Sequence, residues 1–340
     1  MTHPIDKLLA EKGWVLADGA TGTNLFGRGL ETGYPPELWN VERPDDILWL
    51  HNSFLDAGSD LILTNSFGGT SFRLKLHEAQ DRVTELNVAA AKVARAAADA
   101  HSAKTGRTII VAGSIGPTGE LFEPLGALTH DSAVAAFREQ ADALVAGGVD
   151  MLWIETMSSN EEVAAALEAA KATGVKVANT MTFDTAGRSM MGITPGDYAS
   201  FASQHGADLI GANCGIGPAE LLHSVDGMLA AKPGVPVIAK GNCGIPAYVE
   251  GAIHYHGTPE LMADYALFAR DMGATVIGGC CGTSPEHVAA MAAALSGQTK
   301  RPFDADAMQA AIGVAWKDIP QKPDEDDGAR RQRRSRRRDK

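Results

Sequence analysis

Cysteine is scarce in this chain of 340 residues, which contains only Cys214, Cys243, Cys280 and Cys281. Their small number and uneven spacing exclude the disulfide framework of a small secreted protein. Adjacent cysteines rarely bridge to each other, so Cys280 and Cys281 favour metal binding or catalysis. We therefore expect an enzyme of the cytoplasm, where thiols stay reduced.

Long apolar runs are also absent, since none approaches the roughly 20 residues that a membrane-spanning helix needs. Positive charge is concentrated in residues 330–340, whose seven arginines, one lysine and one aspartate give +7. The whole chain is formally −12, so the remaining body carries about −19. A body this acidic does not suit non-specific binding of nucleic acid, and we expect neither a nucleic-acid nor a membrane partner.

What the chain does contain is an alternation of short apolar runs with longer, alanine-rich amphipathic segments. Eight runs have the length of buried strands. They span residues 14–17, 61–64, 108–112, 150–154, 175–181, 208–212, 235–239 and 274–278. Helix-like segments between them span residues 46–57, 83–100, 132–146, 161–172, 218–231, 259–272 and 285–295. Two of these begin at Thr258-Pro259 and Ser284-Pro285, where an N-cap residue precedes a proline at the first helical position.

Eight strand–helix units predict a parallel sheet, and eight is the number that closes a (β/α)₈ TIM barrel. An open doubly wound sheet is the alternative, but no GxGxxG fingerprint lies in the context that a dinucleotide fold requires. We expect one barrel domain over residues 1–312, because the pattern fades after Ile312. Residues 313–340 are acidic and then basic, and predict a disordered tail.

The active site of such a barrel lies at the carboxyl ends of its strands. The segments that follow the apolar runs are polar, rich in glycine or rich in thiols. They are 18–23, 65–69, 114–118, 155–156, 213–215, 241–244 and 280–281. All four cysteines therefore fall at one rim, which predicts a metal site there.

Gly278 and Gly279 precede Cys280 and Cys281, and can break the strand geometry so that both thiols serve one site. Cys214 is the leading candidate for a third thiol, whereas we interpret Cys243 as a free thiol nearby. Three thiolates around Zn²⁺ leave one position open for a substrate thiolate. Zinc would keep that thiolate ionised although the free group has a pKa of about 8.5.

Two carboxylates at the rim suit an ammonium group. They are Asp18 and Glu155, which the barrel frame places at opposite sides of its mouth. Backbone amides of residues 19–23, those of Gly19, Ala20 and Thr21 among them, suit a carboxylate. Together these groups predict an amino acid with a thiol side chain as the substrate.

Six motifs, taken in order, resemble the homocysteine S-methyltransferase family over residues 12–297. They are DGATGT at 18–23, TNSF at 64–67, GSIGP at 113–117, IET at 154–156, NCG at 213–215 and GGCCGT at 278–283. The resemblance implies zinc on Cys214, Cys280 and Cys281, and methylation of homocysteine to methionine. It also implies that Asp18, Gly19, Ala20, Thr21, Asn65, Ser66 and Glu155 bind substrate, with no catalytic residue beyond the zinc-activated thiolate.

Two methyl donors fit the resemblance. A free-standing barrel is similar to the betaine–homocysteine methyltransferases, and implies betaine or a related small onium donor. Gly68 and Thr156 stand where the animal enzymes have tyrosines, whose aromatic faces suit a quaternary ammonium group. Asn65-Ser66-Phe67 and residues 183–188 are instead similar to the homocysteine-binding module of cobalamin-dependent methionine synthase. The alternative is therefore a subunit served by a separate corrinoid protein, and a homo-oligomer fits either interpretation.

Overall fold

Eight parallel strands form the centre of the structure, a computed structural model that describes residues 2–244, 246–249 and 252–316. They are β1 (Val15–Leu16), β2 (Leu61–Leu63), β3 (Ile110–Ile115), β4 (Met151–Met157), β5 (Lys176–Met181), β6 (Leu209–Cys214), β7 (Val237–Gly241) and β10 (Val276–Gly279). They pair in the order β1-β10-β7-β6-β5-β4-β3-β2. A parallel bridge between Ala17 and Leu61 joins the two edges. The predicted barrel is confirmed, and the open-sheet alternative is wrong.

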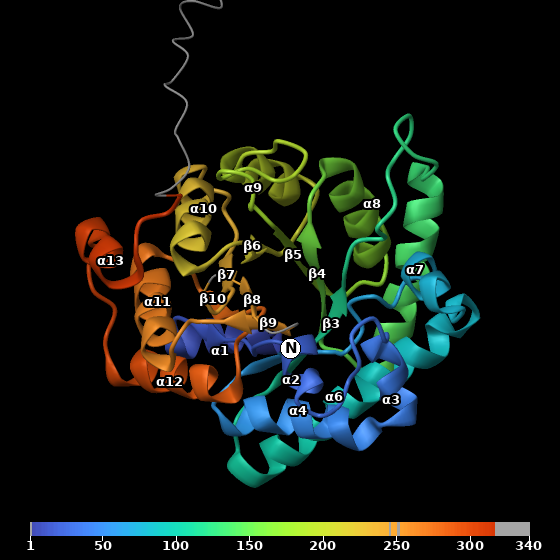
Figure 1. Cartoon of the computed structure of the whole chain (residues 1–340), viewed down its shortest axis with the longest axis horizontal. Helices are drawn as coiled ribbons and strands as arrows, with labels where there is room; N and C mark the ends of the chain where they lie inside the picture. Colours follow the sequence, from blue (N-terminus) through green and yellow to red (C-terminus); the bar gives the residue numbers. More distant parts are fainter. Residues whose placement is uncertain (1, 245, 250–251, 317–340) are drawn as a thin grey trace, which may run out of the picture.

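Helices surround the strands as an outer ring (Figure 1). They are α4 (Pro44–Asp56), α6 (Val83–Thr105), α7 (His130–Gly147), α8 (Asn160–Lys171), α9 (Pro195–Gln204), α10 (Pro218–Ala230), α11 (Pro259–Met272) and α12 (Pro285–Gly297). Seven of them lie at the predicted segments, and the Thr258 side chain caps α11 as expected by accepting a hydrogen bond from the Leu261 amide. Helix α9 was not predicted.

Further short elements follow the strands at the carboxyl rim. After β1 come α2 (Gly22–Phe26), η1 (Pro36–Leu38) and α3 (Trp39–Glu42), and after β2 come α5 (Ser71–Leu74), η2 (Lys75–His77) and η3 (Gln80–Arg82). An antiparallel hairpin of β8 (Pro246–Val249) and β9 (Ala252–Tyr255) follows β7. These insertions were not predicted, and they surround the mouth of the barrel.

The interior of the barrel is filled by side chains that the strands point inwards. Val15, Leu61 and Trp153 belong to this buried cluster, as do Ile5 and Leu8 of α1 (Pro4–Lys12), the helix that precedes β1. Burial of this apolar surface stabilises the closed sheet. Helix α1 therefore closes the amino-terminal end of the barrel and leaves the carboxyl end for a site.

The chain continues past α13 (Ala305–Ile312), which packs against α10 and α11. The Trp316 ring meets the His223 ring edge-on, with centroids 5.0 Å apart. Residues 317–340, which make up most of the predicted tail, lie outside the described residues. No helix in the described part of the chain combines the length and the apolar content that a bilayer crossing requires.

Candidate active site and metal centre

Three thiols gather at the carboxyl rim of the barrel. Cys214 ends β6, and Cys280 and Cys281 directly follow β10. Their Sγ atoms all lie within 4.8 Å of one another, and those of Cys214 and Cys281 are 3.9 Å apart. Zn–S bonds of about 2.3 Å in a tetrahedron separate the sulfurs by ~3.8 Å, so this donor set fits zinc.

Backbone geometry explains why adjacent cysteines reach one site. A Cβ on Gly278 would lie 2.9 Å from the Cβ of Ala17, and one on Gly279 would collide with the Thr283 side chain. The two glycines thus allow β10 to end in a tight turn against β1. The turn is held to β7, because the amide of Cys280 donates to the Gly241 carbonyl (2.6 Å).

The three thiols influence one another's protonation. Hydrogen bonds from Cys214 and Cys280 lower the pKa of the Cys281 thiol. Hydrogen bonding to Cys280 and Cys281 raises the pKa of Cys214. The cluster alone thus favours a shared proton and a localised charge, and a divalent cation would allow all three thiols to ionise.

Cys243 lies outside this cluster. Its fully buried thiol donates to the Gly257 carbonyl (3.3 Å), and burial raises its pKa to about 11. Its amide donates to the Cys281 carbonyl (2.9 Å). Cys243 therefore supports the metal-site turn through its backbone.

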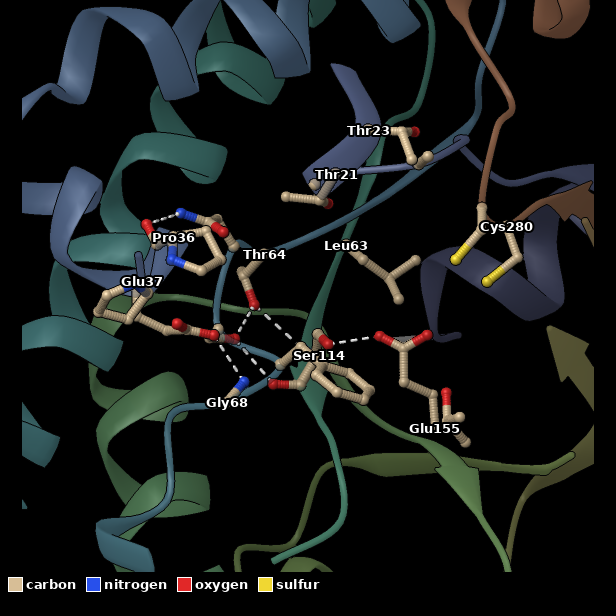
Figure 2. Close-up of a pocket in the computed structure, with 18 of the residues that line it drawn as sticks. Thr21, Thr23, Pro36, Glu37, Leu63, Thr64, Gly68, Ser114, Glu155 and Cys280 are labelled. Atoms are coloured by element: carbon tan, nitrogen blue, oxygen red, sulfur yellow. Dashed lines mark hydrogen bonds between the residues drawn. The ribbon is translucent and has the colours of Figure 1, made fainter. Parts of the chain in front are cut away.

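Glu155 lies on β4 at the same end of the site as Cys280 (Figure 2). Its carboxylate accepts a hydrogen bond from the Ser114 hydroxyl at the end of β3 (2.5 Å). Burial raises its pKa to about 7. A buried carboxylate at this position can bind an ammonium group once it is ionised, and the binding of the substrate by Glu155 stays a prediction.

Asp18 has a different environment. Its Oδ2 atom accepts from the Leu63 amide (2.8 Å), and its Oδ1 atom lies 3.4 Å from the ammonium of buried Lys240. Lys240 also donates to the Gly279 carbonyl (2.6 Å), next to Cys280. Lys240 lines the cavity, whereas Asp18 does not. The role of Asp18 in binding the amino group therefore stays a prediction, and Lys240 is a functional candidate that the sequence analysis missed.

Asn65 and Ser66 both line the cavity, but their side chains bind the protein itself. Asn65 donates from its amide to the Pro36 carbonyl (2.7 Å), and Ser66 donates from its hydroxyl to the Ser114 carbonyl (2.7 Å). The first bond fixes the loop after β2 against the loop after β1, and the second fixes it against β3. A direct contact of either residue with substrate remains a prediction.

The site contains a cavity of about 610 Å³. One part of it, which we call the inner lobe, is lined by Ser114, Glu155, Lys240, Cys214, Cys280 and Cys281. Gly19, Ala20 and Thr21 also line the cavity, and their binding of the substrate stays a prediction. The Ala20 amide already donates to the Thr283 carbonyl (3.0 Å). The outer lobe is the part formed by Tyr34, Glu37, Phe67, Arg73 and His77. Glu155 and Cys280 lie across the cavity from Glu37 and Gly68 (Figure 2).

Replacing Ser114 by alanine should weaken the binding of an ammonium-bearing substrate. The change removes the only side-chain hydroxyl that bonds Glu155 in the described structure, so the carboxylate loses its fixed position. We expect the KM for such a substrate to rise about tenfold with little change in kcat, since one hydrogen bond to a charged group is lost. Steady-state kinetics would measure this, and an unchanged KM would contradict the role.

Comparison with known proteins agrees with this site. The family model described as homocysteine S-methyltransferase matches residues 15–295. Methionine synthases of Mycobacterium tuberculosis and Mycobacterium leprae are each 29% identical to the chain, over 90% and 83% of its length. The chain spans only 26% and 24% of those two relatives.

A solved structure is similar over nearly its whole length. The metallated homocysteine methyltransferase MmuM of Escherichia coli has a TM-score of 0.72 and 25% identity, with 85% of this chain and 99% of that chain covered. Its apo form gives a TM-score of 0.69 at 26% identity. Together with the family match over most of the barrel, these findings show that the chain belongs to the homocysteine S-methyltransferase family.

Proposed function

We propose that this methyltransferase uses a zinc ion on Cys214, Cys280 and Cys281 to methylate homocysteine, forming methionine. The observation that supports the proposal most directly is the spacing of the three sulfurs, which suits a tetrahedral zinc with one position left for a substrate thiolate. When bound, zinc would keep the homocysteine sulfur ionised and nucleophilic at neutral pH. Thiols must stay reduced for this chemistry, so we place it in the cytoplasm.

The residues of the inner lobe would hold the amino acid in position. Glu155 in its ionised form would bind the ammonium group. The backbone amides of Gly19 and Thr21 would face the carboxylate, because that of Ala20 donates to the Thr283 carbonyl. Lys240 would offset part of the negative charge of the thiolates and carboxylates, since it is a buried cation among them. Fixed positions of this kind lower the entropic cost of bringing sulfur and methyl group together.

A small onium compound is the donor that we favour. The chain covers 99% of the Escherichia coli enzyme, and the outer lobe leaves room beside an amino acid. In the reaction the homocysteine sulfur forms a bond to the methyl carbon while the bond from that carbon to the onium atom breaks. The electron pair of the broken bond stays on the leaving nitrogen or sulfur.

A second donor is supported by the methionine synthases. Because the chain spans about a quarter of their length, the barrel alone would be a homocysteine-binding subunit that a separate corrinoid protein supplies. Zinc-loaded protein should therefore be mixed with homocysteine and, in parallel, with betaine, S-methylmethionine or methylcobalamin. Methionine from betaine or S-methylmethionine supports the first donor, and methionine from methylcobalamin alone supports the second. Absence of methionine with every donor would contradict both.

A further inference from the structure

The outer lobe contains a positive charge that nothing in the proposed binding of homocysteine uses. Arg73 belongs to the short helix α5, and its guanidinium lies against Gly119, where an added Cβ would be 3.0 Å from Nη1. Within residues 2–244, 246–249 and 252–316 this guanidinium makes no hydrogen bond and no ion pair. Eight other arginines of the described chain pair with a carboxylate. Arg73 is thus available to an anionic group in the cavity.

A candidate partner for Arg73 within the protein, Glu37, is bound elsewhere. Glu37 is buried, and its Oε1 atom accepts from the Gly68 amide (2.6 Å). No ion pair joins Glu37 to Arg73 in the described structure: burial raises the pKa of Glu37, and the charge of Arg73 only partly opposes that rise. Glu37 instead fixes the backbone of the loop after β2, which precedes the helix that carries Arg73.

Two aromatic rings border the same lobe and are held in place. A Cβ on Gly116 would lie 2.7 Å from the ring of Phe67, so the ring packs where a larger residue at 116 would leave no room for it. Tyr34 donates from its hydroxyl to Glu42 (2.6 Å). The two side chains are 37% and 38% exposed, which leaves ring surface free for a ligand. Fixed aromatic faces attract quaternary ammonium and sulfonium groups.

Charge therefore differs between the two ends of the cavity. The inner lobe holds the thiols, Glu155 and Lys240, and the outer lobe holds Glu37, Arg73 and His77. Lys240 is already bound to Asp18 and to the Gly279 carbonyl, and burial raises the pKa of Glu37, which favours its neutral form. A zwitterion with an onium at one end and a carboxylate at the other would be aligned by this difference. Its cationic methyl group would face the thiolate, and its carboxylate would face the guanidinium.

We propose that Arg73 binds the carboxylate of a zwitterionic methyl donor in the outer lobe, with Phe67 and Tyr34 against the onium group. This inference rests on the proposed function with a small donor. In the transfer, the onium atom keeps the electron pair of its methyl bond and leaves as a neutral amine or thioether. No proton, oxidant or reductant is needed.

The test compares donors with and without a carboxylate in the Arg73→Met variant. Betaine and S-methylmethionine carry the carboxylate, and trimethylsulfonium lacks it. We expect the KM of the first two to rise about 10- to 100-fold, because a hydrogen-bonded charge pair is lost. The KM for homocysteine, the zinc content and the KM for trimethylsulfonium should not change. Arg73→Lys should recover part of the effect, since it keeps the charge and loses the planar fork.

Arg188→Met is the matched control. Arg188 is exposed on the loop after β5, does not line the cavity, and donates to the Gly192 carbonyl (3.1 Å). The control should behave as the unchanged protein with every donor. An unchanged KM for betaine and S-methylmethionine in Arg73→Met would overturn the inference. An equal rise with trimethylsulfonium would also overturn it, because Arg73 would then act without recognising a carboxylate.

Failure of the inference can be told apart from failure of the proposed function. Turnover with trimethylsulfonium or methylcobalamin alone would keep homocysteine methylation and overturn the role of Arg73. If no donor gives methionine, the proposed function fails, and calorimetric titration of the zinc- and homocysteine-loaded protein with betaine decides the inference. Binding that weakens about 10-fold or more in Arg73→Met would support it, and equal or absent binding would overturn it.

Discussion

Replacing Cys280 by serine should abolish metal binding and methyl transfer together. The substitution removes one of three sulfurs that lie within 4.8 Å of one another and leaves a weaker oxygen ligand in its place. We expect zinc affinity to fall on the order of 10³-fold, since each thiolate carries a large share of the binding free energy. Zinc content after dialysis against a chelator and methionine formation would be measured on the same sample.

Cys243→Ser provides the control for this experiment. Cys243 follows a strand at the same rim as the other three cysteines. Its thiol, however, donates a hydrogen bond to the Gly257 carbonyl and lies outside the cluster. This variant should keep its zinc and most of its activity. Full turnover by zinc-free Cys280→Ser would refute the proposed mechanism, whereas zinc loss in Cys243→Ser would make that thiol part of the metal centre.

Replacing Glu155 by glutamine should remove most of the affinity for homocysteine and change how that affinity depends on pH. The pKa of Glu155 is raised to about 7 by burial, so the carboxylate is mostly protonated at pH 6 and mostly ionised at pH 8. Only the ionised form attracts an ammonium group. Homocysteine should thus bind about tenfold more tightly at pH 8 than at pH 6 through this group alone, because the ionised fraction rises about tenfold over that range.

The glutamine variant should lose this gain and bind homocysteine about 100-fold more weakly at pH 8. Ionisation of the homocysteine thiol gives both proteins a common pH dependence, so the ratio of their dissociation constants isolates Glu155. Titrations followed by absorbance of Co²⁺-substituted protein would supply these constants. The matched ligand is 4-mercaptobutanoate, which lacks the amino group and should bind both proteins equally. A ratio that does not vary with pH would contradict the assignment.

The fold was predictable because its signals are local. Each of the eight buried strands is a short apolar run, and each run is found within a few residues of its predicted position. Strands β3, β4, β6 and β7 end two or three residues later than predicted. Backbone pairing continues through Ser114 and Cys214, whereas Glu155 lies at a register shift of β4 between Ile154 and Met157. Helix α9 begins at Thr194-Pro195, the same signal that marks α11, so this helix was predictable from the sequence although it was not predicted.

The site was predictable only where its chemistry is local in sequence. Two glycines and two cysteines in a row identify the metal turn at Cys280. Lys240 carries no such signal, because its partners come from neighbouring strands: it pairs with Gly278 across the sheet and contacts Asp18 beyond. Ser114 likewise meets Glu155 only because β3 and β4 are adjacent. Such contacts depend on strand order and register, which a single sequence does not specify.

Ile5 and Leu8 of α1 fill the amino-terminal end of the barrel, and this affects the order in which the reactants bind and the products leave. Because these side chains fill the amino-terminal end of the barrel in the described structure, we expect both reactants to enter the cavity from its carboxyl end. The acceptor, whose sulfur belongs at the thiols of the inner lobe, must then enter before the donor. The demethylated donor must leave before methionine can. Donor that arrives first would obstruct the entrance, so the steady-state rate should fall when donor is abundant and homocysteine is scarce.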